Sequence, residues 1–222
     1  MNRISPSASQ VLLVALAAIL AAVSCSTTKK SEVAKASAAP ASVEPPPAYR
    51  VIFQTTKGEF TVQVYRPWAP KGADRFFQLV HAKFYDGARF HRVMRKFVAQ
   101  FGINPDPKVN GMWRMLKIPD DEPSHKNTRG TVAFAAGGAN TRSTQVFINL
   151  TNNARLDAQG FAPFGEIVDG MENVDQLTAI YGDVAPLGAG PDSSKIEMQG
   201  NSYLDRDFPR LDGIKTARIS LR

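Results

Sequence analysis

From Tyr49 onward, short runs of alternating apolar and polar residues are broken by two stretches with helical spacing. Tyr49 to Thr56 is rich in β-branched and aromatic residues, and Lys57-Gly58-Glu59 has the composition of a turn. Phe60 to Tyr65 then alternates apolar and polar residues with a period of two. The two runs and the turn between them predict a β-hairpin.

A helix is predicted directly after this hairpin. Pro67 and Pro70 break the strand, and Pro70 suits the first turn of a helix. The apolar residues that follow have the spacing i, i+3, i+4 and i+7: Ala73, Phe76, Phe77 and Val80. This spacing predicts an amphipathic helix that buries one stripe of its surface.

The rest of the domain reads as further short strands and one more helix. The predicted strands lie around Phe90 to Phe101, Arg129 to Phe134, Gln145 to Leu150 and Phe164 to Val168. A second helix is expected after Met171-Glu172, with Val174, Leu177 and Tyr181 on its apolar face. Many short strands, two helices and Gly- and Pro-rich turns favour a mainly β fold, a closed antiparallel barrel with helices at its ends.

The first 48 residues differ in composition from this domain. Residues 1–24 have the form of a signal peptide, because Arg3 precedes an apolar run of thirteen residues from Val11 to Val23. That run is shorter than the roughly 20 residues that span a bilayer. Small residues lead to Cys25, the single cysteine of the chain, and resemble a bacterial lipobox. We expect Cys25 to be lipidated; ordinary cleavage at the same place would leave a secreted protein.

Residues 25–48 contain that cysteine and then a Ser-, Thr-, Lys-, Ala- and Pro-rich segment that ends in three prolines. Such a segment buries too little apolar surface to fold, and we expect a disordered linker. The domain therefore covers residues 49–222, with a C-terminal extension from about residue 182 whose Gly188-Ala-Gly190-Pro191 run has no assigned role.

Composition narrows the possible functions of the domain. With 43% hydrophobic and 21% charged residues the chain can form an ordinary core. The net charge of the chain is +7, and in the domain the positive charge is spread thinly except for one basic cluster from Arg89 to Lys96. A nucleic-acid binder would show a longer basic face with exposed aromatics, so we expect no nucleic-acid partner. His81, His91 and His125 lie far apart without acidic or cysteine neighbours at ligand spacing, so no metal site is predicted. We expect Asp120-Asp121-Glu122 to be a solvated loop.

The most informative stretch is Tyr85 to Gly102, YDGARFHRVMRKFVAQFG. It places a guanidinium (Arg92), an aromatic ring (Phe97) and a side-chain amide (Gln100) within nine positions of a strand pattern. Together they suit a short piece of peptide backbone with an apolar ring attached, which is what a prolyl peptide offers.

Three blocks of the sequence resemble the cyclophilin-type peptidyl-prolyl isomerases. FYDGARFHRVMRKFVAQFG is similar to the family signature, the block from Gly130 to Ile148 to its loop and strand, and the block from Leu156 to Met171 to its last strand before a helix. The resemblance implies a closed eight-stranded antiparallel barrel capped by two α-helices, and cis–trans isomerisation of X-Pro bonds without a cofactor.

The resemblance also implies roles for single residues. Arg92 would be the catalytic guanidinium, and Gln100 the amide that holds the substrate backbone. The substrate-binding residues would be His91, Phe97, Ala135, Ala136, Gln145, Phe147, Arg155, Leu156 and Phe161. Arg155 stands where many members have a tryptophan tied to cyclosporin binding, so the resemblance does not extend to sensitivity to that drug.

We therefore expect a monomeric bacterial isomerase that acts on proline-containing unfolded or flexible polypeptides during folding of exported proteins. It would be lipid-anchored in the cell envelope, facing the periplasm, or secreted. The alternative is a non-catalytic scaffold lipoprotein that binds proline peptides on the same barrel.

Overall fold

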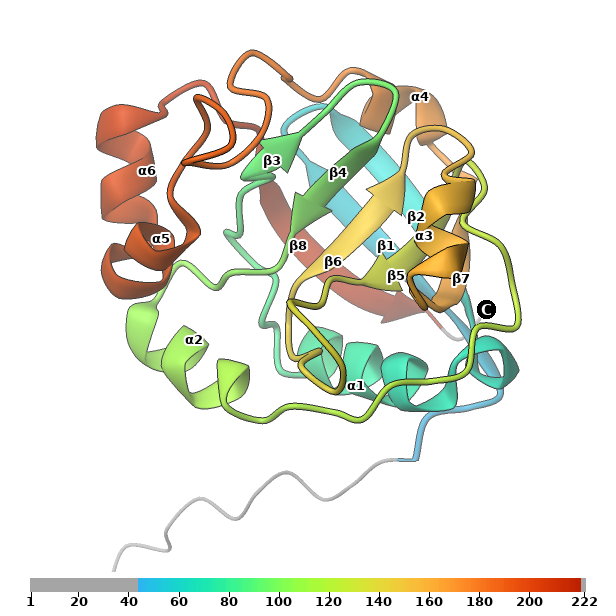
Figure 1. The fold of residues 1–222 in the computed structure, drawn as a ribbon. Coiled ribbons are helices and arrows are strands. Elements are labelled where there is room, and N and C mark those ends of the chain that lie inside the picture. The colour runs from blue at the N-terminus through green and yellow to red at the C-terminus, as the bar shows by residue number, and fades with distance from the viewer. Residues whose placement is uncertain (1–43, 221–222) are drawn as a thin grey trace, which may run out of the picture. The chain divides into compact units, whose positions relative to one another are not determined.

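The computed structural model describes residues 44–220, so the predicted signal peptide, Cys25 and most of the predicted linker lie outside the described residues. Within that range the chain forms one mainly antiparallel sheet with short helices around it (Figure 1). The strands are β1 (Ala48–Thr55), β2 (Gly58–Tyr65), β3 (Arg92–Val93), β4 (Val98–Phe101), β5 (Thr131–Phe134), β6 (Val146–Asn149), β7 (Pro163–Asp169) and β8 (Ile214–Ser220). The helices are the 3₁₀ turn η1 (Arg66–Trp68) and α1 (Pro70–His81), α2 (Pro107–Arg114), α3 (Ala154–Ala158), α4 (Met171–Asp175), α5 (Ser193–Gln199) and α6 (Asn201–Asp207).

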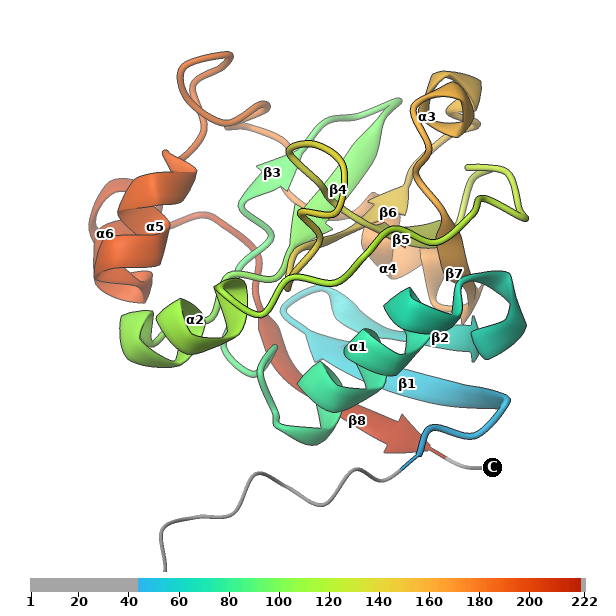
Figure 2. The ribbon, with the colours of Figure 1, turned by 60° about the horizontal axis from the view of Figure 1, so that its bottom comes forward.

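The predicted hairpin is confirmed as β1 and β2, which pair from Ala48 opposite Tyr65 to Thr55 opposite Gly58. The predicted amphipathic helix is α1, which begins at Pro70 and buries Ala73, Phe76 and Val80. It lies against β7 and β8 (Figure 2), and the Phe76 ring centroid is 4.8 Å from that of Phe164.

The prediction of a closed barrel is wrong, because the eight-stranded sheet is open. Its strand order is β3-β4-β6-β5-β7-β2-β1-β8, with β3 and β8 at the edges. β3 is only two residues long, and the chain turns back after it through Lys96, whose φ is 62°. The segment before β3 meets the segment before β8 through single backbone hydrogen bonds, including Phe90 N to the Asp212 carbonyl at 2.9 Å.

The prediction of two capping helices is also wrong. The described residues contain six α-helices, and the second predicted helix is short: α4 ends at Asp175, before Leu177 and Tyr181. The C-terminal extension is an integral part of the fold, since β8 pairs with β1 along its length.

Residues 182–213, which we call the insert, carry α5 and α6 and have a small core of their own. Ile196, Tyr203, Leu204 and Leu211 are buried there against Ile103 of the main body. Figure 1 shows α5 and α6 beside α2, away from the strands β1 and β2. Among the described residues no helix is long and apolar enough to cross a membrane.

Candidate active site

A cavity of about 570 Å³ lies between the β3–β4–β6 part of the sheet, α3 and the insert. The residues that line it are Arg92, Phe97, Val98, Gln100, Ala135, Ala136, Gly137, Phe147, Arg155, Leu156, Gln159, Phe161, Asp183, Val184, Leu187 and Ser193. Nine of the predicted site residues are therefore brought together at one place, although they come from four separate parts of the chain.

Strand register places the two polar groups of the motif side by side. Arg92 on β3 pairs with Gln100 on β4, and Gln100 pairs in turn with Phe147 on β6. Arg92 Nη1 donates to Gln100 Oε1 at 3.3 Å, and Gln100 Nε2 donates to Gln145 Oε1 at 2.9 Å. Each amide therefore fixes the orientation of its neighbour along the row.

The opposite wall of the cavity is apolar. Phe147 and Leu156 are buried, and the half-buried rings of Phe97 and Phe161 pack against them. The Phe147 and Phe161 rings meet edge to face with centroids 5.6 Å apart. The Arg92 guanidinium carbon lies 5.5 Å from the Phe97 ring centroid, so the charged wall joins the apolar wall through a cation–π contact.

Buried amides behind the apolar wall hold it in place. Asn153 Nδ2 donates to the Phe97 carbonyl at 3.0 Å and to Asn149 Oδ1 at 2.7 Å. Asn127 Nδ2 donates to the Phe161 carbonyl at 2.9 Å. These bonds attach the backbone of two cavity rings to the buried end of β6, which limits how far the rings can move.

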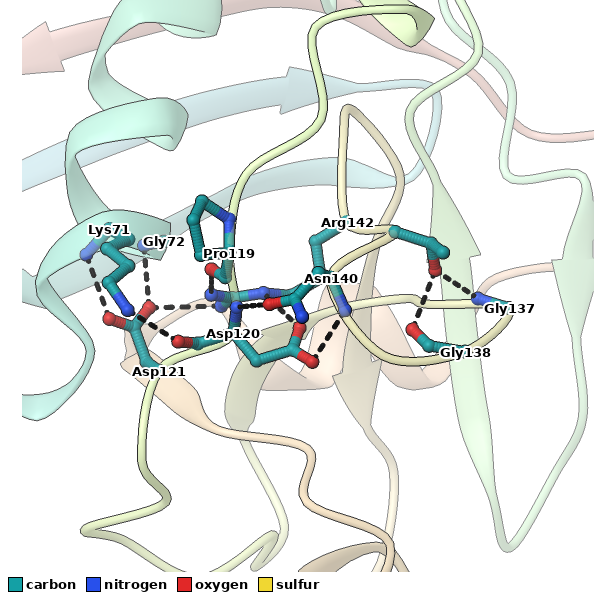
Figure 3. A network of polar contacts seen from close by, with 10 residues as sticks. Lys71, Gly72, Pro119, Asp120, Asp121, Gly137, Gly138, Asn140 and Arg142 are labelled. Atoms are coloured by element: carbon teal, nitrogen blue, oxygen red, sulfur yellow. Dashed lines mark hydrogen bonds and ion pairs between the residues drawn. The ribbon is translucent and has the colours of Figure 1, made fainter.

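A second polar network holds the loop after β5, whose first residues line the cavity (Figure 3). Arg142 Nη1 donates to Asp121 Oδ2 at 3.0 Å, and that carboxylate also accepts the backbone N–H groups of Lys71 and Gly72 at the start of α1. Asp120 and Asn140 bond each other's backbone N–H. The expectation of a solvated loop at 120–122 is wrong for Asp121, which is only 7% exposed because it is bonded to Arg142 and α1.

His91 and Gln145 are placed outside the cavity. Gln145 lines a neighbouring hollow of about 240 Å³ that shares Gln100, Ala135 and Ala136 with it. His91, predicted to contact the substrate, is 1% exposed and does not line either space. Burial, together with the nearby Arg92 charge, lowers the His91 pKa to about 4, so the imidazole is neutral at pH 7.

The sequence motifs missed Asp183. Its carboxylate accepts from Arg92 Nε at 2.6 Å and from Arg92 Nη2 at 3.3 Å. Hydrogen bonding to Arg92 lowers the Asp183 pKa below its usual value. No local pattern marks this residue, because its partner is 91 positions away in the chain.

The comparisons with known proteins agree with this geometry. A family model described as "Cyclophilin type peptidyl-prolyl cis-trans isomerase/CLD" matches residues 50–195. The chain belongs to this family, and its enzyme class is peptidyl-prolyl cis-trans isomerase.

Similar curated proteins come from bacteria and animals. The chain is 33% identical over 144 residues to a peptidyl-prolyl cis-trans isomerase of Acinetobacter baylyi, covering 60% of this chain and 75% of that one. It is 31% identical to peptidyl-prolyl cis-trans isomerase B of Escherichia coli, covering 59% and 84%. It is 32% identical to mouse peptidyl-prolyl cis-trans isomerase-like 3, covering 57% and 80%.

A solved structure shares the fold. The Cryptosporidium parvum cyclophilin type isomerase cgd2_1660 superposes with a TM-score of 0.58 at 21% identity, covering 79% of this chain and 99% of that one. The likeness supports the cyclophilin-like, mainly β fold with eight antiparallel strands.

Proposed function

We propose that this protein accelerates X-Pro isomerisation in exported polypeptides, with Arg92 as the catalytic group. The observation that carries the proposal is the row Arg92–Gln100 beside a cavity walled by Phe97 and Phe147. A charged donor and an apolar wall therefore lie at one place.

The reaction needs little more than these parts. Rotation about a peptide bond meets a barrier of about 18–20 kcal/mol because the nitrogen lone pair is shared with the carbonyl. The two X-Pro isomers differ by only about 0.5–1 kcal/mol, so a catalyst has only to lower the barrier. A guanidinium N–H of Arg92 that donates to the prolyl nitrogen favours the twisted amide.

The other cavity residues hold the substrate while the bond turns. The proline ring sits against Phe97, Phe147, Leu156 and Phe161, out of water. Gln100 holds the substrate backbone beside Arg92, Gln145 contacts it in the adjoining hollow, and Ala135 and Ala136 leave room for the chain. Another structure of the Cryptosporidium parvum isomerase was solved in the presence of the dipeptide Ala-Pro, and we propose that a ligand of the same chemistry binds in this cavity.

The proposal also includes the localisation of the protein. Cleavage after residue 24 and lipidation of Cys25 would attach residues 25–48 to a membrane of the bacterial envelope and leave the isomerase facing exported chains. Intact-mass measurement of the protein from the membrane fraction tests this. A diacylglyceryl mass on Cys25 is expected, and an unmodified chain in the soluble fraction would contradict it.

The enzymatic test compares wild type with Arg92→Ala and Arg95→Ala in a protease-coupled assay on a prolyl tetrapeptide. Arg95 is an exposed arginine of the same basic cluster that does not line the cavity, so its removal controls for lost charge. Arg92→Ala should lower kcat/KM about a hundredfold with an unchanged circular dichroism spectrum, and Arg95→Ala should change little. Full activity of Arg92→Ala would refute the mechanism. Binding of the peptide without any acceleration by the wild type would favour the scaffold function instead.

A further inference from the structure

Arg92 is held from two sides, and the second side comes from the insert. Gln100 takes one N–H of Nη1, whereas the Asp183 carboxylate takes the Nε–H and one N–H of Nη2. A guanidinium has five N–H donors. One donor on each terminal nitrogen is left over, and the bidentate contact fixes the plane in which both point.

The loop that carries Asp183 is folded around this residue. Gly190 N donates to the Asp183 carbonyl at 2.8 Å, and Val184 N donates to Asp183 Oδ1 at 2.9 Å. A Cβ atom added at Gly188 or at Gly190 would lie 2.5 Å from the Asp183 carbonyl oxygen, which is closer than real contacts allow. The Gly188-Ala-Gly190-Pro191 run therefore has a role: its glycines let the chain turn tightly enough to present the carboxylate.

The loop that carries Asp183 continues into the packed helices α5 and α6 of the insert. Asp192 begins α5 by accepting from Ser194 N and Lys195 N, and Ile196 of that helix is buried in the core of the insert. Asn201 Nδ2 donates to the Gly87 carbonyl at 2.9 Å, which connects the start of α6 to the segment before β3. Asp183 thus approaches Arg92 from a defined direction.

We propose that Asp183 is a positioning residue for Arg92, and that the insert supplies it for this purpose. The proposal rests on the proposed catalytic role of Arg92. An exposed ion pair adds little to stability, but this pair is mostly buried, with side chains 22% and 18% exposed. We infer that the ion pair raises the rate of the reaction, because the Arg92 side chain is already oriented and loses less conformational freedom when it donates to the twisted amide.

The carboxylate also affects the charge of the cavity. Arg92 and Asp183 compensate each other, which leaves Arg155 as the cavity-lining charge without an ion pair among residues 44–220. The two effects predict opposite results. If orientation dominates, removal of Asp183 lowers the rate; if compensation dominates, removal raises it. The bidentate geometry and the tight loop that presents Asp183 favour the first effect, the orientation of Arg92.

The experiment measures kcat and KM for wild type, Asp183→Ala, Asp183→Asn and Asp205→Ala on one prolyl peptide. Asp205→Ala is the matched control, since it breaks an ion pair of the same insert that lies outside the cavity. We expect kcat to fall about tenfold in Asp183→Ala and less in Asp183→Asn, which keeps one acceptor, while KM stays nearly constant. Asp205→Ala should leave both constants unchanged.

A spectroscopic readout separates positioning from loss of structure. The Nε–H resonance of Arg92 should exchange slowly with water in wild type and in Asp205→Ala, and quickly in Asp183→Ala. Equal or higher kcat in Asp183→Ala, or an equal kcat loss in Asp205→Ala, would overturn the positioning role. A wild type without isomerase activity would instead overturn the proposed function on which it rests.

Discussion

The sheet side and the insert side of the cavity hold the same guanidinium by different means. On the sheet side, Gln100 and Phe147 are fixed by strand register, and Phe147 is buried in a small apolar cluster with Val98, Ala133 and Leu156. On the insert side, Asp183 is presented by a loop whose tip residue, Leu187, is 79% exposed. The sheet side is therefore part of the folded body of the protein, whereas the loop holds the guanidinium from outside that body.

The largest effect should come from the sheet side. Phe147→Ala removes a ring that is 4% exposed and touches Phe161, and we expect about 3–5 kcal/mol less free energy of unfolding together with most of the activity lost. Denaturant unfolding monitored by tryptophan fluorescence measures the first, and the peptide assay measures the second. A stable Phe147→Ala protein would show that this wall is not part of the core.

Lowering the pH should destabilise the protein through His91 before it breaks the Arg92–Asp183 pair. The His91 pKa of about 4 lies below that of a free histidine near 6.5, so the unfolded chain binds the extra proton first. Stability should therefore be complete above pH 6.5 and fall by about 3 kcal/mol as the pH drops to 4. His91→Gln should remove this slope in unfolding experiments at several pH values.

The Arg92–Asp183 pair should survive the same range, because the Asp183 pKa is lowered from 3.8. The Arg92 Nε–H signal should stay protected from pH 6.5 to pH 4. Loss of that signal in step with the His91 titration would show that the two sides are coupled.

The network of Figure 3 should give a smaller effect on stability. Asp121→Asn keeps the size of the side chain but leaves the buried Arg142 with only Asp120, whose side chain is 40% exposed, as a counter-charge. We expect about 2 kcal/mol lower stability. Asp207→Asn, which alters the exposed pair with Arg206, is the control and should show no measurable change. Equal melting temperatures for Asp121→Asn and wild type would contradict the role of this network.

The smallest effect belongs to the loop tip. Leu187→Ser should raise KM about threefold without a change in melting temperature, because an open site buries only part of the leucine. A matched change at Leu116, which is 53% exposed and does not line the cavity, should leave KM unaltered. A large loss of stability in Leu187→Ser would mean that the loop contributes to the core after all.

The sequence predicted what depends on local pattern. The hairpin and α1 follow from period-two or helical spacing within a few residues, and the structure has both. Arg92 and Gln100 were predicted to act together, but they meet across a turn between β3 and β4 that the predicted single strand did not contain. Two further helices carried readable signals that were missed: Asp106 before Pro107 caps α2, and Asp192 caps α5.

Long-range pairing could not be predicted in this way. Asp183 contacts Arg92, and Asp121 contacts Arg142, but no sequence pattern links the members of either pair. No feature of the sequence therefore indicated that Asp183 holds the Arg92 guanidinium or that the Asp121 carboxylate is buried. β3 is two residues long and lies at an edge of the open sheet, whereas the sequence pattern predicted one strand over the whole run from Phe90 to Phe101.

The most direct test of the account is the isomerisation rate of a prolyl peptide, measured by exchange NMR with wild type, Arg92→Lys and Arg92→Ala. If an oriented guanidinium beside the cavity speeds the rotation, the lysine variant keeps the charge but not the fork and should be nearly as slow as the alanine variant. A lysine variant that matches the wild-type rate would contradict the account, because charge alone would then suffice.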